Sequence, residues 1–81
     1  MELRTLHYFV TVAEELNITK AAEILRISQP PLSAQIKNLE AELGTELFVR
    51  GKRQLTLTDA GQLLYQHAKD ILKLSERRLR K

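Results

Sequence analysis

The sequence predicts a mainly α-helical domain in which three helices are followed by a small two-stranded hairpin and one long helix. Between Ala21 and Ser33, a short apolar helix, a tight break and a proline-started helix follow one another directly, which is typical of a helix-turn-helix. Gly51 and Lys52 lie between two segments with the pattern of short strands, as in a hairpin. From Asp59 a helical pattern runs to the end of the chain. This order of elements is that of a winged helix-turn-helix, with the hairpin as the wing.

The first helix is expected over residues 3–16, because apolar side chains recur there at spacings of three and four residues, as on one face of an amphipathic helix. These positions are Leu3, Leu6, Phe9, Val10, Ala13 and Leu16. Residues 17–19 interrupt the pattern. Thr19 is a good N-cap, so the second helix is expected over residues 20–26. A helix this short depends on packing for its stability.

The third helix is expected to begin after Ser28 as its N-cap and to stop at Gly44. Residues 29–31 fill its first turn, where the missing N–H groups of the two prolines cost little. Its buried stripe is expected to be Leu32, Ile36, Leu39 and Leu43. The opposite, polar face has no carboxylate before Glu40. Because a solvated face ordinarily mixes both signs of charge, this favours a nucleic-acid partner.

The wing is expected to contain strands at residues 47–50 and 54–57. Its tip, Arg50-Gly51-Lys52-Arg53, is the most basic compact segment of the chain. The net charge is +3, and acidic residues concentrate before Leu47, whereas the tip and residues 77–81 are strongly positive. Such a polarised distribution is what a phosphate-facing surface requires. For residues 77–81 we prefer the simpler interpretation of a solvated helix end, where cations suit the helix dipole.

The final helix is expected to start at Thr58, whose hydroxyl can cap it, with Asp59 in the first turn. Residues 59–81 correspond to about 34 Å of helix, which overhangs so small a domain. An exposed apolar stripe on this helix needs a partner, and we predict a dimer interface there. The predicted interface residues are Leu63, Leu64, His67, Ala68, Ile71, Leu72 and Leu74.

Composition and motifs exclude several classes of function. The chain has no cysteine, which excludes disulfides, thiolate zinc sites and cysteine nucleophiles. It has no glycine-rich phosphate loop or nucleophile motif, and His7 and His67 lack metal-ligating partners at a suitable spacing. We therefore predict neither an enzyme nor a metal or cofactor site. No apolar run reaches membrane-spanning length, so a soluble, cytoplasmic protein is expected.

Three groups of residues are predicted to bind double-stranded DNA. Residues at the start of the third helix suit base edges and nearby phosphates: Gln29, Ser33, Ala34 and Lys37. Two residues at the start of the second helix suit phosphate: Thr19 and Lys20. Wing cations suit the DNA backbone or a narrow minor groove: Arg50, Lys52 and Arg53. An alternative is a winged-helix protein-interaction or assembly module, which would self-associate through the long helix without binding DNA specifically.

A series of short motifs extends over essentially the whole chain. Its members are Leu3-Arg4 with Leu6, Tyr8-Phe9, Val12-Ala13-Glu14, Lys20-Ala21-Ala22, Ser28-Gln29-Pro30, Leu32-Ser33, Gln35-Ile36, Leu39-Glu40, Leu43-Gly44, Leu47-Phe48, Arg50, Arg53, Leu57-Thr58 and Ala60-Gly61. Any one of them is weak evidence, but the series at matching spacing is specific. In this series the chain resembles the N-terminal DNA-binding domain of LysR-type transcriptional regulators.

The resemblance implies a bacterial regulator in which residues 1–58 form the DNA-binding domain and residues 59–81 a linker helix. It implies a homodimer, made by antiparallel linker helices, that reads a partly palindromic operator with recognition helix 29–43 in the major groove and wing 50–53 at the minor groove. It also implies a C-terminal effector-binding domain, absent from this chain, that takes a small-molecule inducer, and a tetramer at full length.

The resemblance further implies individual DNA contacts. Residues expected at bases or their phosphates are Gln29, Pro30, Pro31 and Ser33, whereas Arg53 is expected in the minor groove. Residues expected near phosphate are Arg50, Thr56 and Thr58. Two positions depart from the family pattern. Many relatives have Arg at the position of Ala34, and losing a bidentate guanine contact removes about 1–3 kcal/mol of discrimination. A hydroxyl residue is frequent at the position of Gly51.

Overall fold

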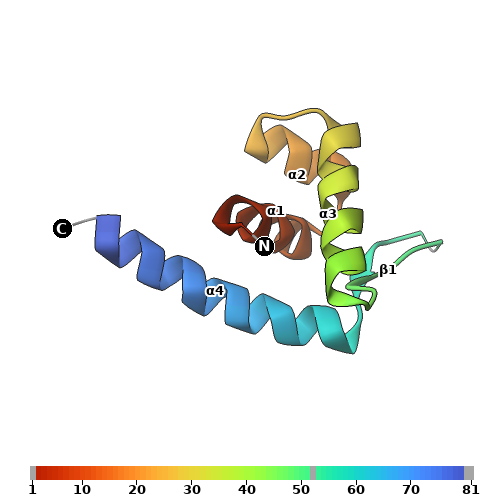
Figure 1. The fold of residues 1–81 in the computed structure, drawn as a ribbon. Helices are drawn as coiled ribbons and strands as arrows, with labels where there is room; N and C mark the ends of the chain where they lie inside the picture. Colours follow the sequence, from red (N-terminus) through yellow and green to blue (C-terminus); the bar gives the residue numbers. More distant parts are fainter. Residues whose placement is uncertain (1, 52, 80–81) are drawn as a thin grey trace.

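Helix α1 (Leu3–Glu15) lies at the centre of the molecule and contacts every other helix. Figure 1 shows α2 on one side of it, α4 on the other, and α3 crossing beside it with the wing next to α3. The computed structural model describes residues 2–51 and 53–79, and of residues 75–79 it describes the backbone alone. The remaining elements are α2 (Ile18–Leu25), α3 (Gln29–Leu43), β1 (Phe48–Val49), β2 (Thr56–Leu57) and α4 (Asp59–Leu79). This order confirms the predicted winged helix-turn-helix.

The core is aliphatic apart from one aromatic pair. Phe9 of α1 and Phe48 of β1 are fully buried, with ring centroids 5.5 Å apart. The predicted stripe of α3 is confirmed at Leu32, Ile36 and Leu39. It is wrong at Leu43, which is 40% exposed because it is the last residue of the helix, beyond the part that faces the core.

The ends of α1 and α2 differ from the expectation. Helix α1 stops one residue early, because Leu16 is left-handed (φ 51°) and its N–H bonds to the Val12 carbonyl. Asn17, rather than Thr19, caps α2, and its Oδ1 accepts the Lys20 N–H at 2.9 Å. Asparagine caps at least as well as threonine, and starting the helix at Ile18 packs that side chain against the core.

Ser28 occupies the expected N-cap position of α3, but its side chain makes no cap hydrogen bond. A capping side chain accepts from the second or third N–H of the helix. In α3 those positions are Pro30 and Pro31, which have no N–H. The hydroxyl of Ser28 therefore has no backbone N–H to accept at the start of α3, and the residue is exposed.

The wing strands are shorter than the expected segments 47–50 and 54–57. They pair antiparallel, with Phe48 opposite Leu57 and Val49 opposite Thr56. The loop between them is correspondingly longer, and Gly51 within it is left-handed (φ 86°), a conformation that glycine tolerates.

Helix α4 begins as predicted, because the Thr58 hydroxyl accepts the Gly61 N–H at 3.0 Å. The same hydroxyl donates to the Glu46 carbonyl at 2.7 Å. Gly61 is buried beside Leu47, the residue before β1, where a Cβ would overlap the Leu47 carbonyl oxygen. The start of α4 is thus held against the base of the wing.

Along its length, α4 runs past the body of the molecule (Figure 1), whose principal extents are 43 × 26 × 19 Å. The predicted dimer stripe divides into two faces. Ala68 is fully buried within its own chain, and Leu64 and Leu72 pack against the same core. These three residues lie on the inward face of α4, and their part in a dimer interface stays a prediction. The outward face carries the exposed residues Leu63, His67, Ile71 and Leu74.

None of the helices in the described part of the chain combines the length and hydrophobicity that crossing a membrane requires.

Candidate nucleic-acid interface

The start of α3 projects from the body. Its exposed residues are Gln29, Pro30, Pro31, Ala34 and Lys37, whereas Ser33 is partly buried. Leu32 and Ile36 anchor the opposite side of the helix in the core. The helix therefore offers its first two turns to a ligand while its buried face fixes its direction.

Within this exposed face, one hydrogen bond links two predicted base-reading residues. The amide Nε2 of Gln29 donates to the Ser33 hydroxyl oxygen at 3.2 Å. The second N–H of that amide and its carbonyl oxygen remain for a ligand. A glutamine amide presented in this way can pair with the N6 and N7 edge of adenine.

Thr19 and Lys20 lie exposed in the first turn of α2. The Lys20 N–H is taken by Asn17, but the N–H groups of Ile18 and Thr19 have no acceptor within the helix. Helix N-termini attract anions for this reason. The earlier start of α2 therefore still leaves free N–H groups in the turn where phosphate binding is predicted. Asn17 caps that turn.

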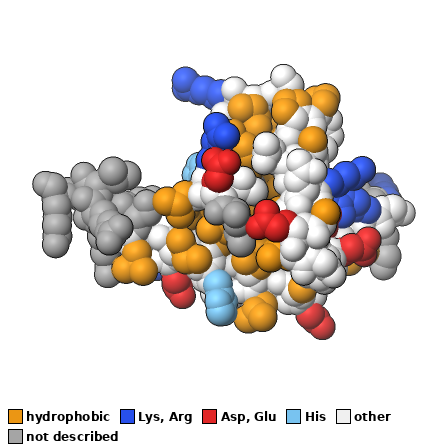
Figure 2. All heavy atoms as spheres, viewed as in Figure 1, with side chains coloured by type: hydrophobic (Ala, Val, Ile, Leu, Met, Phe, Trp, Pro, Cys, Tyr) orange, Lys and Arg blue, Asp and Glu red, His pale blue; other side chains and the backbone are white. Residues whose placement is uncertain are grey.

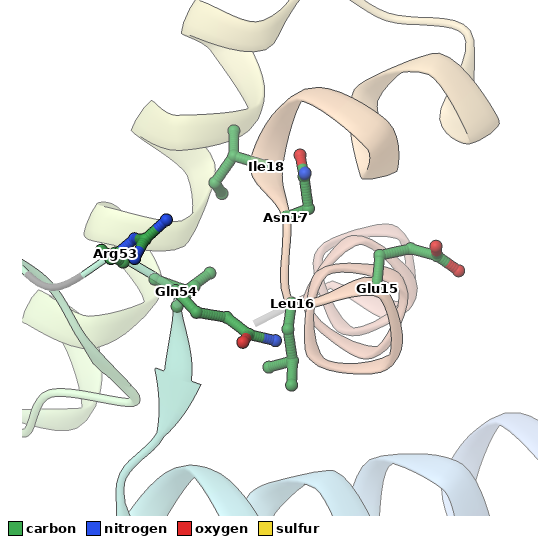
Figure 3. Close-up of a pocket in the computed structure, with 7 residues that line it drawn as sticks. Glu15, Leu16, Asn17, Ile18, Arg53 and Gln54 are labelled. Atoms are coloured by element: carbon green, nitrogen blue, oxygen red, sulfur yellow. The ribbon is translucent and has the colours of Figure 1, made fainter.

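An open groove of about 760 Å³ separates the start of α2 from the wing. Figure 3 shows Arg53 and Gln54 on one side of it and Leu16 and Asn17 on the other, with the Glu15 side chain pointing away from Arg53. Arg53 is exposed and lines this groove, so its guanidinium is accessible to a ligand there.

A smaller hollow of about 230 Å³ lies between α3 and the wing. Its polar lining comes from Ser33, Lys37 and Arg50, and Ile18 and Leu55 line both this hollow and the larger groove. Figure 2 shows Lys and Arg side chains gathered where the wing lies beside α3. Predicted residues of α3 and of the wing are therefore adjacent, and Ile18 places the start of α2 beside them.

Arg50 has a partner that the sequence did not predict. Its Nη2 lies 2.8 Å from Oε1 of Glu40 and its Nη1 donates to Oε2 at 3.1 Å. Glu40 is only 9% exposed, and Oε2 also accepts the N–H groups of Leu47 and Phe48 at 2.7 and 3.3 Å. We expected Glu40 on the polar face. The available signal was its position four residues after Ile36, on the buried stripe.

Burial raises the pKa of the Glu40 carboxyl, but the hydrogen bond and charge of Arg50 and the two backbone N–H donors outweigh it. The pKa of Glu40 consequently lies below its ordinary value, so the group is ionised at neutral pH. Arg50 is therefore bound within the fold by two of its nitrogens, and only its remaining N–H groups are available to a phosphate.

The other wing residues differ in availability. Thr56 is exposed, whereas the Thr58 hydroxyl already donates its proton to the Glu46 carbonyl. In this arrangement the Thr58 hydroxyl has no second proton to donate to a phosphate, and its expected contact stays a prediction. Lys52 lies outside the described residues. In the described part of the chain, His, Asp and Glu side chains do not gather in groups of three that could hold a metal ion.

Comparison with known proteins agrees with this geometry. A family model described as "Bacterial regulatory helix-turn-helix protein, lysR family" matches residues 3–62. The transcriptional regulator BudR of Klebsiella aerogenes is 57% identical over 81 residues, which cover 100% of this chain and 57% of BudR. BenM of Acinetobacter baylyi is 56% identical over 72 residues, which cover 89% of this chain and 24% of BenM. The chain thus spans from about a quarter to just over half of these relatives, which are named as regulators and not as enzymes.

Solved structures give the same result. A complex of the BenM DNA-binding domain with catB site 1 DNA has a TM-score of 0.95 and 51% identity, covering 98% of this chain and 88% of that chain. A complex of the CbnR DNA-binding domain with DNA has a TM-score of 0.91 and 45% identity, covering 96% of this chain and 90% of that chain. The match of sequence motifs, fold and exposed helix face leads to one conclusion: this chain belongs to the lysR family of bacterial regulatory helix-turn-helix proteins.

Proposed function

We propose that this chain is the DNA-binding domain of a cytoplasmic transcriptional regulator and that it binds double-stranded DNA sequence-specifically as a homodimer. The observation that carries the proposal is the exposed start of α3 beside two hollows that hold Lys37, Arg50 and Arg53. A helix of this kind enters the major groove while flanking cations meet the backbone. The similar BenM and CbnR domains are described as DNA complexes.

Base recognition rests on the first two turns of α3. Gln29 reads an adenine edge, and Pro30, Pro31 and Ala34 offer carbon atoms to thymine methyl groups. Ala34 cannot supply the paired N–H donors that an arginine gives to guanine. The preferred site therefore depends on Gln29, on apolar contacts and on DNA shape.

Phosphate binding comes from both sides of α3. Thr19 and Lys20 act at the start of α2, Lys37 acts from α3, and Arg53 acts from the wing, reaching the minor groove. Thr56 contacts phosphate beside Arg53. Arg50 contributes only through the N–H groups that Glu40 leaves free. Ser28 is a further phosphate-binding candidate, because its exposed hydroxyl makes no cap hydrogen bond.

In this proposal, residues 1–58 carry the DNA contacts and the helix of residues 59–81 carries the dimer interface. The described exposed residues of that interface are Leu63, His67, Ile71 and Leu74. They recur every three or four residues, as a helix–helix seam requires. An antiparallel pair presents two α3 helices to half-sites about 34–36 Å apart. The full-length protein would form a tetramer and respond to a small-molecule inducer in a further domain.

A binding titration tests the proposal. A duplex is selected from a random pool with this chain, and its affinity is compared with that of a scrambled duplex of equal length. We expect tighter binding of the selected duplex and a steep loss of affinity with added salt. Equal affinity for the two duplexes would contradict sequence-specific binding and favour the protein-assembly module.

Sedimentation tests the dimer. Ile71→Glu puts a charge on the outward face of α4 and should convert the dimer to a monomer. The matched control, Gln66→Glu, adds the same charge at an exposed position outside the proposed seam and should leave the dimer intact. A parent chain that sediments as a monomer at high concentration would count against the interface.

A further inference from the structure

The wing has little β-sheet to fix its direction. Its two strands pair through only two residue pairs, Phe48–Leu57 and Val49–Thr56. An isolated two-stranded hairpin is marginally stable in water. Contacts outside the sheet must therefore set the angle at which the tip, including Arg53, leaves the body.

One carboxylate makes such contacts at the point where the chain enters and leaves β1. Glu40 accepts the N–H groups of Leu47 and Phe48 and forms a two-point ion pair with Arg50. A two-point guanidinium–carboxylate contact fixes direction as well as distance. Through Glu40, the direction of the wing is tied to α3, the helix that carries the base-reading residues.

We propose that Glu40 is a positioning residue for DNA recognition. Through Arg50 and the two backbone N–H groups it sets the angle between α3 and the wing, so that Gln29 and Arg53 reach the same duplex together. It touches no DNA itself, because it is buried beneath the hairpin. This inference rests on the proposed function, which requires α3 and the wing to bind one duplex.

The proposal gives Arg50 a different role from that of Arg53. The charge of Arg50 is balanced by the nearly buried carboxylate of Glu40, although 39% of the Arg50 side chain is exposed. Arg53 is exposed at the groove beside α2. Arg50 therefore acts as a structural cation, and its contribution to the salt dependence of binding is small. A phosphate-binding arginine would contribute through its charge, which a lysine can replace.

The test compares two affinities for each variant: that for the duplex selected by the parent chain and that for its scrambled counterpart. Glu40→Gln keeps the shape of the side chain and removes its charge. We expect about a tenfold loss of affinity for the selected duplex and no loss for the scrambled one, so that the ratio falls. The control, Glu46→Gln, makes the same charge change at an exposed residue beside the wing and should keep the ratio.

A merely stabilising role for Glu40 predicts a different result. Partial unfolding lowers both affinities by the same factor and leaves their ratio unchanged. A second variant, Arg50→Lys, covers the case in which Glu40→Gln fails to fold. It keeps the positive charge but loses the two-point contact, so positioning predicts a lower ratio and an unchanged salt slope.

If the variants that fold keep the parent's ratio of affinities for the selected and scrambled duplexes, the positioning role is overturned. The same holds if Arg50→Lys lowers the ratio no more than Glu46→Gln does. A parent chain that does not prefer its selected duplex counts against the proposed function itself, and this inference then falls with it. The two failures are thus separate.

Discussion

The Tyr65 hydroxyl donates a hydrogen bond of 2.9 Å to Oε2 of Glu14, joining α4 to the last turn of α1. The two residues are 51 positions apart in the sequence. The Lys69 ammonium lies 5.3 Å from the centroid of the Tyr65 ring, on the same helix. The hydrogen bond ties the long helix to the body at about one third of its length, and Ala68 and Leu72 continue the contact further along.

Tyr65→Phe should lower the free energy of unfolding by about 0.5–1 kcal/mol, because it removes a partly exposed hydrogen bond to a charged acceptor. Urea denaturation measures the change. Glu14→Ala in the Tyr65→Phe background should cost less than Glu14→Ala alone, since the bond is already absent. Equal costs in the two backgrounds would mean that the hydroxyl and the carboxylate do not interact.

Two candidate cap residues should differ in their response to the same substitution. Asn17→Ala removes the acceptor of the Lys20 N–H and should cost about 1 kcal/mol. Ser28→Ala should change stability by less than about 0.5 kcal/mol, because prolines occupy the positions that a cap would bond. The midpoints of chemical denaturation, compared in parallel, check both values. A large cost at Ser28 would contradict the absence of a cap bond.

Gly61→Ala should destabilise the domain although it improves helix propensity. Propensity alone predicts a gain of about 1 kcal/mol, but the new Cβ would overlap the Leu47 carbonyl and crowd the Leu57 side chain. We expect a net loss of about 1–3 kcal/mol. Gln62→Ala, at the next exposed position, is the control and should be nearly neutral. A stabilised Gly61→Ala variant would rule out the close approach of α4 to the Leu47 carbonyl.

Acidification should weaken the fold through Glu40. The pKa of Glu40 lies below its ordinary value of 4.5 in the folded chain, since the Arg50 contact and the backbone donors outweigh burial. A carboxyl of this kind contributes stability that is fully present above its unfolded pKa and is lost as the pH falls through the folded pKa. Denaturation midpoints of the parent should therefore drop below about pH 4.5, and less steeply in Glu40→Gln. Parallel pH profiles for the two proteins would exclude this contribution.

Gln29→Ala and Arg53→Ala should affect DNA binding in different ways. Gln29→Ala should cost about 1–3 kcal/mol of discrimination at one base pair and leave the salt dependence unchanged. Arg53→Ala should weaken binding to most duplexes and lower the salt slope by about 1. Anisotropy titrations at several salt concentrations distinguish the two effects. Parental behaviour in both variants would show that the assigned contacts are wrong.

The fold was predictable because its determinants are local. The period of α3, the prolines in its first turn and the Thr58 cap are all present within short segments of sequence. Local sequence did not decide whether Asn17 or Thr19 caps α2, because both residue types can cap a helix. Packing of Ile18 against the core favours the earlier start.

The site was predictable only in part. Exposed side chains such as Gln29 and Arg53 follow from helical period and turn position, but their DNA contacts stay predictions. Glu40 was missed because its partners come from the following strand, and a charged residue on a buried stripe is explained only once that strand is placed. The inward position of Ala68 was not predictable, because the sequence of α4 does not distinguish an inward apolar face from an outward one.

The contact of Phe48 with Phe9 has a consequence for redesign of this domain. Because the base of the hairpin is part of the hydrophobic core, shortening it would open the interior, whereas substitutions at exposed loop positions such as Gln54 would not. Libraries intended to retarget the domain to new DNA sites can therefore randomise the exposed loop positions and the outer surface of α3, while Arg50 and Leu55 are kept with the scaffold beneath them.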